Sequence, residues 1–381
     1  MSKTQSGGAV RILHCHSTFS AGGKERRAVE LMNAFGRAAE HTIVSGMPEE
    51  LSARALVNRN VRVRYPVDFP SLSGTPTPGR LVSLARALEG FDLILTYNWG
   101  AMDVVMAHTI FGQQFGLAPL IHHEDGFNED EANQLKTSRN LYRTAALWRS
   151  DALVVPSSVL ETIALTKWRQ PRDRVIRIPN GIDTAAFAKK PKPGALRVVK
   201  REGEKWVGTL AGLRPVKQLP QLVEAIRTLP ENWHLVIVGE GPEQTTIREA
   251  ASHAEVDHRV HLPGAIKDPS TVIGMFDIFA LSSRSEQFPL SVVEAMAAGL
   301  PVVAPDVGDI AKIVARENAD YITPAGDVGE LAEALEEMAD DDEARAEIGK
   351  ANQAKARAQF DKAMMIDRYR SLYGSVLGRE F

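Results

Sequence analysis

Short apolar runs alternate with helix-like segments along the whole chain, and this order is the strongest constraint on its fold. The runs that predict β-strands are Val10–His14, His41–Ser45, Leu93–Tyr97, Leu120–His122, Ala152–Pro156, Val175–Pro179, Trp206–Ala211, His234–Gly239, Val260–Pro263, Ile278–Ser282, Pro301–Ala304 and Asp320–Thr323. Helical patterns lie between them, including Lys24–Arg37, Gln221–Thr228, Pro289–Ala298 and Val328–Met338. Because strands that alternate with helices form parallel sheets through right-handed crossovers, the pattern predicts an α/β protein with doubly wound sheets.

The chain has 381 residues, which is enough for two domains that each bury a core. Residues 184–196 resemble a linker, because they combine prolines, a glycine and lysines with weak periodicity. We therefore expect one Rossmann-like domain over residues 1–185 and a second over residues 186–359. Residues 360–381 form a final segment, in which the pattern predicts a helix over Phe360–Leu377 with one apolar face.

The charge balance excludes some classes of protein. Lys and Arg number 45 against 48 Asp and Glu, and this near-neutral balance argues against a nucleic-acid partner. The net charge of −3 divides into +3 for residues 1–185 and −6 for residues 186–381. Peripheral contact of the first half with an anionic inner membrane face therefore stays open.

The single cysteine, Cys15, excludes an intramolecular disulfide framework and a cysteine-rich zinc site, and it fits a reducing compartment. The N-terminus lacks the apolar core of a signal peptide. No run reaches the roughly 18 apolar residues that a membrane-spanning helix needs. We expect a cytoplasmic protein.

Two short segments that follow predicted strands suit phosphate binding. Gly22 and Gly23 allow close backbone approach before a helix N-terminus, and Lys24 adds positive charge. Arg214 and Lys217 follow the first strand of the second half, and such a pair can neutralise a diphosphate. The alternatives are a simple turn at the glycines and two exposed loop cations at 214 and 217.

Two glutamates flank the start of a predicted helix in the second half. Glu286 lies in the loop after a strand, and Glu294 lies in the helix among apolar and small residues. A partly buried carboxylate such as Glu294 needs a partner, and a ribose diol can donate two hydrogen bonds to it. Backbone N–H groups near Phe288 and Leu290 would point at a phosphate. An ordinary helix N-terminus explains Glu286 but leaves Glu294 unexplained.

The Glu-x7-Glu spacing with the string EAMAAGLPVV resembles the retaining glycosyltransferases of sequence family 4, which have the GT-B fold. Other strings match the same family in the same order: AGGKERRAVEL, VPSSVLE, IPNGID, LRPVK, VIVGEGPE and VHLPGAIKD. The resemblance covers nearly all of the chain. It implies two Rossmann-like domains that face a central cleft, with the acceptor in the first domain and the nucleotide sugar in the second. It also implies that the terminal helix crosses back to the first domain.

The resemblance assigns roles in the donor site. Gly22 and Gly23 would face the diphosphate and the acceptor, and Arg214 and Lys217 would bind the diphosphate. Glu286 would hold sugar hydroxyls. The remaining implied donor contacts are Gly239, Gly241, Pro263, Ala265, Phe288, Pro289, Leu290 and the ribose-binding Glu294.

The chain departs from the family pattern at two places. Many members have arginine five residues before the phosphate-binding lysine, where this chain has Gly212 and offers Arg214 instead. The first domain commonly has a histidine near the donor sugar, and here Asp125 takes the aligned place. Asp125 would accept a sugar hydroxyl or balance developing positive charge. His123 is the second choice, and a buried strand-end histidine is the alternative for His122 and His123.

Acceptor contacts are expected in the first half. Asn98, Trp99 and Asp103 follow the strand Leu93–Tyr97, although packing in the core is the alternative for Trp99. The other candidate acceptor-binding residues are Lys24, His123 and Phe127.

Metal binding is weakly indicated by the sequence. His14 and His16 alternate on one strand face around Cys15, which suits metal ligation, but a third ligand is missing. Asp340–Asp342 more closely fits a helix start. The resemblance implies no essential metal.

We therefore expect a metal-independent, hexosyltransferase-like enzyme that moves a sugar from a nucleotide-diphosphate donor to a glycan, glycolipid or small-molecule hydroxyl with retention. Its catalytic residues would be Asp125, Glu286, Arg214 and Lys217. It would need no essential cofactor, and the nucleotide-diphosphate sugar would be its donor substrate. Cell-envelope or polysaccharide biosynthesis is the expected setting, with UDP, GDP or ADP as the nucleotide. A nucleotide-sugar epimerase and a non-catalytic nucleotide-sugar-binding subunit are the alternatives, and the oligomeric state stays open.

Overall fold

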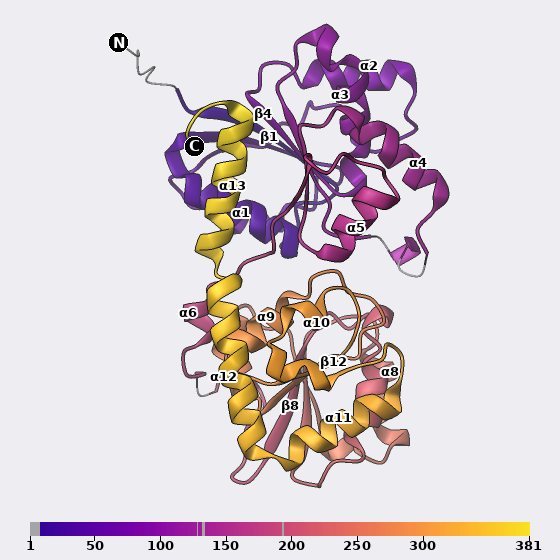
Figure 1. Ribbon diagram of the computed structural model, residues 1–381, viewed down its shortest axis with the longest axis vertical. Helices are drawn as coiled ribbons and strands as arrows, with labels where there is room; N and C mark the ends of the chain where they lie inside the picture. The colour runs from indigo at the N-terminus through magenta and orange to yellow at the C-terminus, as the bar shows by residue number, and fades with distance from the viewer. Residues whose placement is uncertain (1–7, 128, 132–133, 193) are drawn as a thin grey trace. The chain divides into compact units, whose positions relative to one another are not determined.

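The computed structural model describes residues 8–127, 129–131, 134–192 and 194–381 (Figure 1). The chain divides into two compact units. Unit 1 comprises Met1–Pro179 together with Met365–Phe381, and unit 2 comprises Asn180–Met364. The boundary predicted at residue 185 lies a few residues further along the chain. Met365–Phe381 belongs to unit 1, although the whole of unit 2 separates it in sequence from the rest of that unit.

Unit 1 contains a parallel sheet with strand order β3-β2-β1-β4-β5-β6-β7. Its strands are β1 (Val10–His16), β2 (Ala39–Ser45), β3 (Arg62–Arg64), β4 (Leu93–Tyr97), β5 (Leu120–His123), β6 (Ala152–Val155) and β7 (Val175–Arg177). Its helices are α1 (Gly23–Phe35), α2 (Pro78–Ala87), α3 (Met102–Phe115), α4 (Thr137–Ala146), α5 (Ser158–Thr166) and most of α13 (Lys362–Leu377). The chain runs outward from β1 in both directions, so β1 and β4 flank the point where the strand order reverses.

Helices cover both faces of this sheet. On one face α1 and α13 lie side by side, and Leu31 and Phe35 pack with Tyr369 and Tyr373 (Figure 1). On the other face α2, α3 and α5 contribute buried side chains to a second apolar cluster. Two covered faces explain why the strands read as continuous apolar runs rather than alternating ones.

Unit 2 contains a parallel sheet with strand order β10-β9-β8-β11-β12-β13. Its strands are β8 (Lys205–Leu210), β9 (Trp233–Val238), β10 (Val260–Gly264), β11 (Ile278–Ala280), β12 (Val302–Pro305) and β13 (Ile322–Thr323). Its helices are α6 (Thr184–Phe187), α7 (Leu219–Ile226), α8 (Gln244–His253), α9 (Leu290–Ala297), α10 (Ile310–Ile313), α11 (Val328–Asp340) and α12 (Asp342–Gln359). The strand order reverses between β8 and β11.

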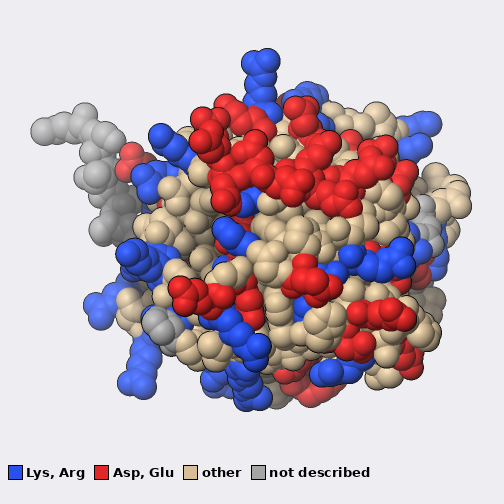
Figure 2. All heavy atoms as spheres, turned by 90° about the horizontal axis from the view of Figure 1, so that it is seen from below, with Lys and Arg blue, Asp and Glu red and all other residues tan. Residues whose placement is uncertain are grey.

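Helices cover both faces of the second sheet as well. Leu222, Ile247 and Leu335 place α7, α8 and α11 on one face, and Met296 and Ala356 place α9 and α12 on the other. Figure 2 shows acidic side chains gathered over one part of the surface of unit 2, where α11 and the start of α12 are rich in carboxylates. Much of the negative charge of residues 186–381 is therefore gathered on this part of the surface.

The sequence-predicted strands are confirmed to within two residues at most ends. The exception is β3, which the apolar pattern did not predict because two of its three residues are exposed arginines and only Val63 is partly buried. The linker prediction for residues 184–196 is wrong at its start. Asp183 accepts a hydrogen bond from the Ala186 N–H and caps α6, which buries Phe187 in the core of unit 2.

The prediction that Asp340–Asp342 starts a helix is confirmed, since Asp341 caps α12 by accepting from the Ala344 N–H. In the part of the chain that the structure describes, no helix is long and apolar enough to cross a bilayer.

Candidate active site

In unit 2 the loops after β8 and β11 meet at the switch point of the sheet, where open α/β sheets bind ligands. Lys217 Nζ donates to Glu286 Oε1 at 2.5 Å, and Ser283 Oγ donates to the same oxygen at 2.7 Å. The Arg284 N–H donates to the Val216 carbonyl at 2.9 Å and ties the two loops together. The structure therefore brings together two sequence-predicted residues that lie 69 positions apart.

Arg214 occupies the same loop as Lys217, three residues earlier. Its side chain is exposed and forms no ion pair with any described residue. A guanidinium in this condition keeps its donors available for a doubly charged anion. Lys217, by contrast, is largely buried and already engaged by Glu286.

The loop after β9 lies directly against the loop after β8. Gly239 and Gly241 have φ of +156° and +158°, and a Cβ at these positions would lie 1.8 Å from the Ala211 oxygen and 2.4 Å from the Leu213 oxygen. Only glycine permits this approach. Pro263 lies near the end of β10, and the Ala265 N–H that follows that strand donates to Glu240 Oε1 at 3.4 Å.

The helix α9 begins at Leu290, with Pro289 as N-cap and no side-chain cap. No capping side chain therefore accepts a hydrogen bond from its first N–H groups. Phe288 packs edge-to-face on Phe360 with ring centroids 5.7 Å apart, which anchors the loop. Glu294 is half-buried on this helix, as the sequence predicted.

In unit 1 the loop after β1 leads into α1, with Gly22 as N-cap and no side-chain cap. Gly23 opens the helix, and Glu25 lies in its first turn. Lys24 is ion-paired with Glu25, which also accepts from Thr18 Oγ1 at 3.3 Å. The Glu25 carboxylate therefore lies at the N-terminus of α1, and the Lys24 ammonium is paired with it.

Asp125 forms a two-point ion pair with Arg27, a residue of α1 that the sequence did not mark as a candidate. Both carboxylate oxygens accept from the guanidinium, and the Nη2–Oδ2 distance is 2.9 Å. Asp125 is 13% exposed and Arg27 5%. The Asp125 N–H donates to Asn98 Oδ1 at 2.8 Å, so Asn98 positions the Asp125 loop.

His123 lies fully buried at the end of β5. Its Nδ1 is 3.2 Å from the Thr96 carbonyl, and its Nε2 is 3.2 Å from the Tyr373 hydroxyl of α13. Burial lowers the pKa of His123 well below its ordinary value. His122 is also buried, so the structure places both histidines in the core at this strand end, where the alternative expected one.

His14 and His16 are also buried and stack near Tyr97. His14 bonds to the Tyr97 hydroxyl at 3.1 Å and to His41 at 2.9 Å. Among the described residues, no group of three or more His, Cys, Asp or Glu side chains is arranged to hold a metal ion.

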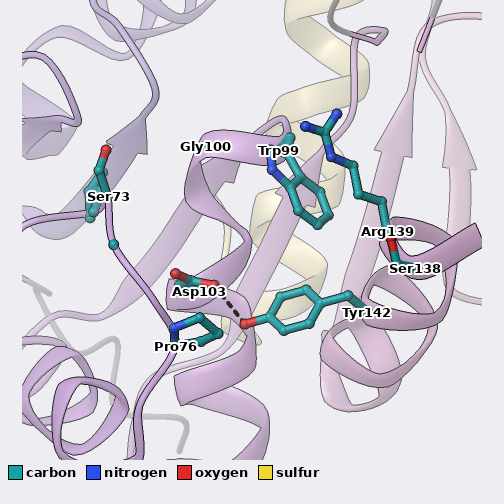
Figure 3. A pocket seen from close by; sticks show the side chains of 10 residues that line it. Ser73, Pro76, Trp99, Gly100, Asp103, Ser138, Arg139 and Tyr142 are labelled. Atoms are coloured by element: carbon teal, nitrogen blue, oxygen red, sulfur yellow. Dashed lines mark hydrogen bonds between the residues drawn. The ribbon is translucent and has the colours of Figure 1, made fainter. Parts of the chain in front are cut away.

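Phe127 and Trp99 pack around the guanidinium of Arg143, which is buried and bonded to Glu131. Trp99 also borders a cavity of about 480 Å³ in unit 1 (Figure 3). The cavity is bordered by Ser73, Pro76, Asp103 and Tyr142 as well. Among the residues that border the cavity, only Trp99 and Asp103 were predicted from the sequence, because Ser73 and Tyr142 come from segments that carry no recognisable motif.

Two doubly wound parallel sheets in one chain, each with its loops at a switch point, define the GT-B class of proteins. Residues 21–186 match the family model described as Glycosyltransferase Family 4, and residues 197–355 match the one described as Glycosyl transferases group 1. The two matches together span most of the chain, which belongs to glycosyltransferase family 4.

Similar proteins include the N-acetyl-alpha-D-glucosaminyl L-malate synthase of Bacillus anthracis, which is 26% identical over 88% of this chain and 89% of its own. The D-inositol 3-phosphate glycosyltransferase of Corynebacterium glutamicum is 24% identical over 82% of this chain and 79% of its own. A crystal structure of Anabaena HepE in complex with UDP has a TM-score of 0.81 at 20% identity, covering 96% of this chain and 100% of that one. This last likeness confirms the GT-B fold.

Proposed function

We propose that this protein is a retaining glycosyltransferase that moves a hexose-type sugar from a nucleotide-diphosphate donor to an acceptor hydroxyl. The single observation that carries the proposal is the Lys217–Glu286 pair beside the exposed Arg214 at the switch point of unit 2. This arrangement offers a diphosphate the exposed Arg214 and the two ammonium donors of Lys217 that its ion pair with Glu286 leaves, and it offers sugar hydroxyls the Glu286 carboxylate.

In the proposed donor complex, Arg214 and Lys217 bind the diphosphate and Glu286 accepts hydrogen bonds from the sugar. The α9 N-terminus, preceded by Phe288 and Pro289, directs its N–H groups at phosphate. Glu294 accepts from the ribose hydroxyls, and the loops that contain Gly239, Gly241, Pro263 and Ala265 surround the nucleotide. The UDP complex of the HepE structure supports UDP as the first nucleotide to test.

The proposed reaction needs no covalent enzyme intermediate. The C–O bond between the anomeric carbon and the leaving phosphate breaks, and its electron pair stays on the diphosphate. The acceptor oxygen forms the new bond on the same face of the sugar, and its proton passes to the departing phosphate oxygen. Lys217 and Arg214 stabilise the charge that develops on the diphosphate.

In unit 1 we assign Asp125 an electrostatic role toward the positively charged sugar ring of the transition state. Arg27 holds both carboxylate oxygens, so this role is orientation and charge balance rather than proton transfer. The Gly22–Gly23 loop faces donor and acceptor in this scheme. We place the reaction in the cytoplasm, with peripheral membrane contact in the case of a lipid-linked acceptor.

Incubation with UDP-, GDP- and ADP-sugars, with and without a crude acceptor extract, tests this function through the amount of free nucleotide. The proposal predicts release that depends on one donor and rises with the extract. Tight donor binding without release above the enzyme-free control would support a non-catalytic sugar-nucleotide-binding subunit. Formation of an isomeric nucleotide sugar without acceptor would identify an epimerase.

A further inference from the structure

The cavity in unit 1 lies at the switch point between β1 and β4. Gly100, which borders the cavity, follows β4 and lies so close to Ser17 after β1 that an added Cβ would be 2.3 Å from the Ser17 Cβ. Doubly wound sheets bind ligands at this position, and about 480 Å³ is within the usual range of small-molecule sites, roughly 300–1,000 Å³.

Arg80 of α2 holds one wall of the cavity in place. Its Nη2 donates to the carbonyls of Ser71 at 3.0 Å and Leu72 at 2.7 Å, and its Nη1 donates to Asp103 Oδ2 at 2.5 Å. The segment that begins at Leu72 and includes Ser73 and Pro76 is therefore fixed to α3. A wall held in this way gives the cavity its shape before any ligand binds.

The carboxylate of Asp103 is the main polar group of the cavity. It accepts from the Tyr142 hydroxyl at 2.6 Å in addition to Arg80. An ionised carboxylate offers about four acceptor positions, so two remain for a ligand. The side chain is 18% exposed, and its remaining acceptors suit ligand hydroxyls.

Two fixed aromatic rings form the opposite side. Trp99 and Tyr142 pack edge-to-face with centroids 5.8 Å apart, and they face Ser73 and Pro76 across the cavity (Figure 3). The guanidinium groups of Arg139 and Arg143 each lie 4.9 Å from the indole ring. Because both guanidinium groups lie over the indole, the apolar surface offered to the C–H groups of a saturated ring comes mainly from Tyr142.

The cations near the cavity are already neutralised. Arg80 pairs with Asp103, and the Arg139 Nη1 donates to Asp130 at 3.0 Å and to Glu131 at 2.9 Å. No lysine lies among the described residues that border the cavity. A phosphate or carboxylate entering it would lose hydration and meet the Asp103 carboxylate without an unpaired cation.

We propose that this cavity binds the ring of the acceptor, and that this ring is a neutral, hydroxyl-bearing sugar or cyclitol. The inference rests on the proposed transferase function and adds the chemical class of its acceptor. Asp103 accepts hydrogen bonds from ring hydroxyls, while Tyr142 and the edge of Trp99 contact the C–H groups. A neutral acceptor ring would distinguish this chain from relatives whose names specify malate or inositol 3-phosphate, because these two compounds carry anionic groups.

Saturation-transfer NMR on the full chain tests the proposal directly. The neutral probes are methyl α-glycosides of glucose, galactose, mannose and N-acetylglucosamine, together with myo-inositol. The anionic probes are L-malate and inositol 1-phosphate. The variants Ser138→Trp and Ser73→Trp change exposed serines on opposite sides of the cavity and fill it from either side. Thr162→Trp, on the exposed face of α5, is the matched control.

We expect at least one neutral probe to give a signal that falls fivefold or more in both cavity-filling variants and stays unchanged in Thr162→Trp. Equal melting temperatures of the variants establish that each is folded. Cavity-dependent signals from the anionic probes, or no cavity-dependent signal from any neutral probe, would overturn the proposal. UDP titration of the same samples separates the two claims, because UDP binding with no ring binding rejects this inference alone. Absence of any donor binding or turnover rejects the proposed function instead.

Discussion

Lys217 Nζ lies 2.5 Å from Glu286 Oε1, and the two side chains form an ion pair between the loops that follow two neighbouring strands of unit 2. Their side chains are only 16% and 11% exposed, so the pair is partly withdrawn from water. Removing one partner leaves the other charge without compensation. Lys217 belongs to the phosphate-binding part of the proposed donor site and Glu286 to its sugar-binding part, so this ion pair links the two parts.

Lys217→Met and Glu286→Gln should each lower donor turnover by about 100-fold or more, the usual cost of removing a preorganised electrostatic contact. Nucleotide affinity should separate the two variants. Lys217→Met weakens UDP binding because a phosphate partner is lost, while Glu286→Gln mainly impairs sugar-dependent turnover. Titration calorimetry with UDP and a nucleotide-release assay measure both quantities. Normal turnover in both variants would reject the donor-site assignment.

Arg214→Ala should weaken binding of the nucleotide diphosphate by about tenfold, corresponding to loss of one charge-assisted contact of roughly 1.4 kcal/mol. Because the side chain is exposed, the free energy of unfolding should change by less than about 0.5 kcal/mol. Arg248→Ala, at an exposed position of α8, is the matched control. Equal UDP affinities of the two variants would exclude Arg214 from the site.

Arg27→Met should destabilise the protein by about 3–5 kcal/mol, because it leaves Asp125 mostly buried without its cation. Arg62→Ala provides the comparison. Its ion pair with Glu40 is largely exposed, and its loss should cost less than about 1 kcal/mol. Urea unfolding followed by tryptophan fluorescence measures both values. Similar losses in the two variants would show that Arg27 and Asp125 contribute no more than a surface pair.

Acidification should destabilise the protein through its buried histidines. Burial lowers the pKa of His41 to about 4, and burial together with neighbouring positive charge lowers those of His14 and His16 well below the ordinary value. Between about pH 6.5 and 4 the unfolded chain binds protons that the folded state excludes. The free energy of unfolding therefore falls as pH falls, by up to about 1.4 kcal/mol per pH unit for each histidine.

The variant His41→Gln should reduce this slope by up to one proton, and His253→Gln, at an exposed position of α8, should leave it nearly unchanged. Urea unfolding at several pH values from 7.5 to 4.5 provides the slopes. A free energy of unfolding that is constant over this range would contradict the assignment of neutral buried rings.

The sequence predicted most strands because buried parallel strands are continuous apolar runs, and it placed Lys217 and Glu286 after strands that proved to be neighbours. It did not predict β3, whose three residues leave too little apolar signal. It assigned no role to Arg27, because nothing in a helical surface pattern shows that a cation will pair with Asp125 almost 100 residues away.

The sequence did not predict the cavity, although two of the residues that border it, Trp99 and Asp103, were candidates for acceptor contact. Its wall depends on hydrogen bonds from Arg80 to two backbone carbonyls, and such contacts leave no pattern in the residue order. Tyr142 reaches Asp103 from a different helix. Side chains that meet only through the tertiary fold require coordinates.

The most direct test of the central claim is the anomeric configuration of the product. A donor sugar labelled with ¹³C at the anomeric carbon, incubated with the protein and an acceptor, allows NMR to follow that carbon from nucleotide to product. The account predicts a new glycoside with the same anomeric configuration as the donor and one free nucleoside diphosphate per glycoside formed. A product of inverted configuration, or a label that never leaves the nucleotide with any donor, would contradict it.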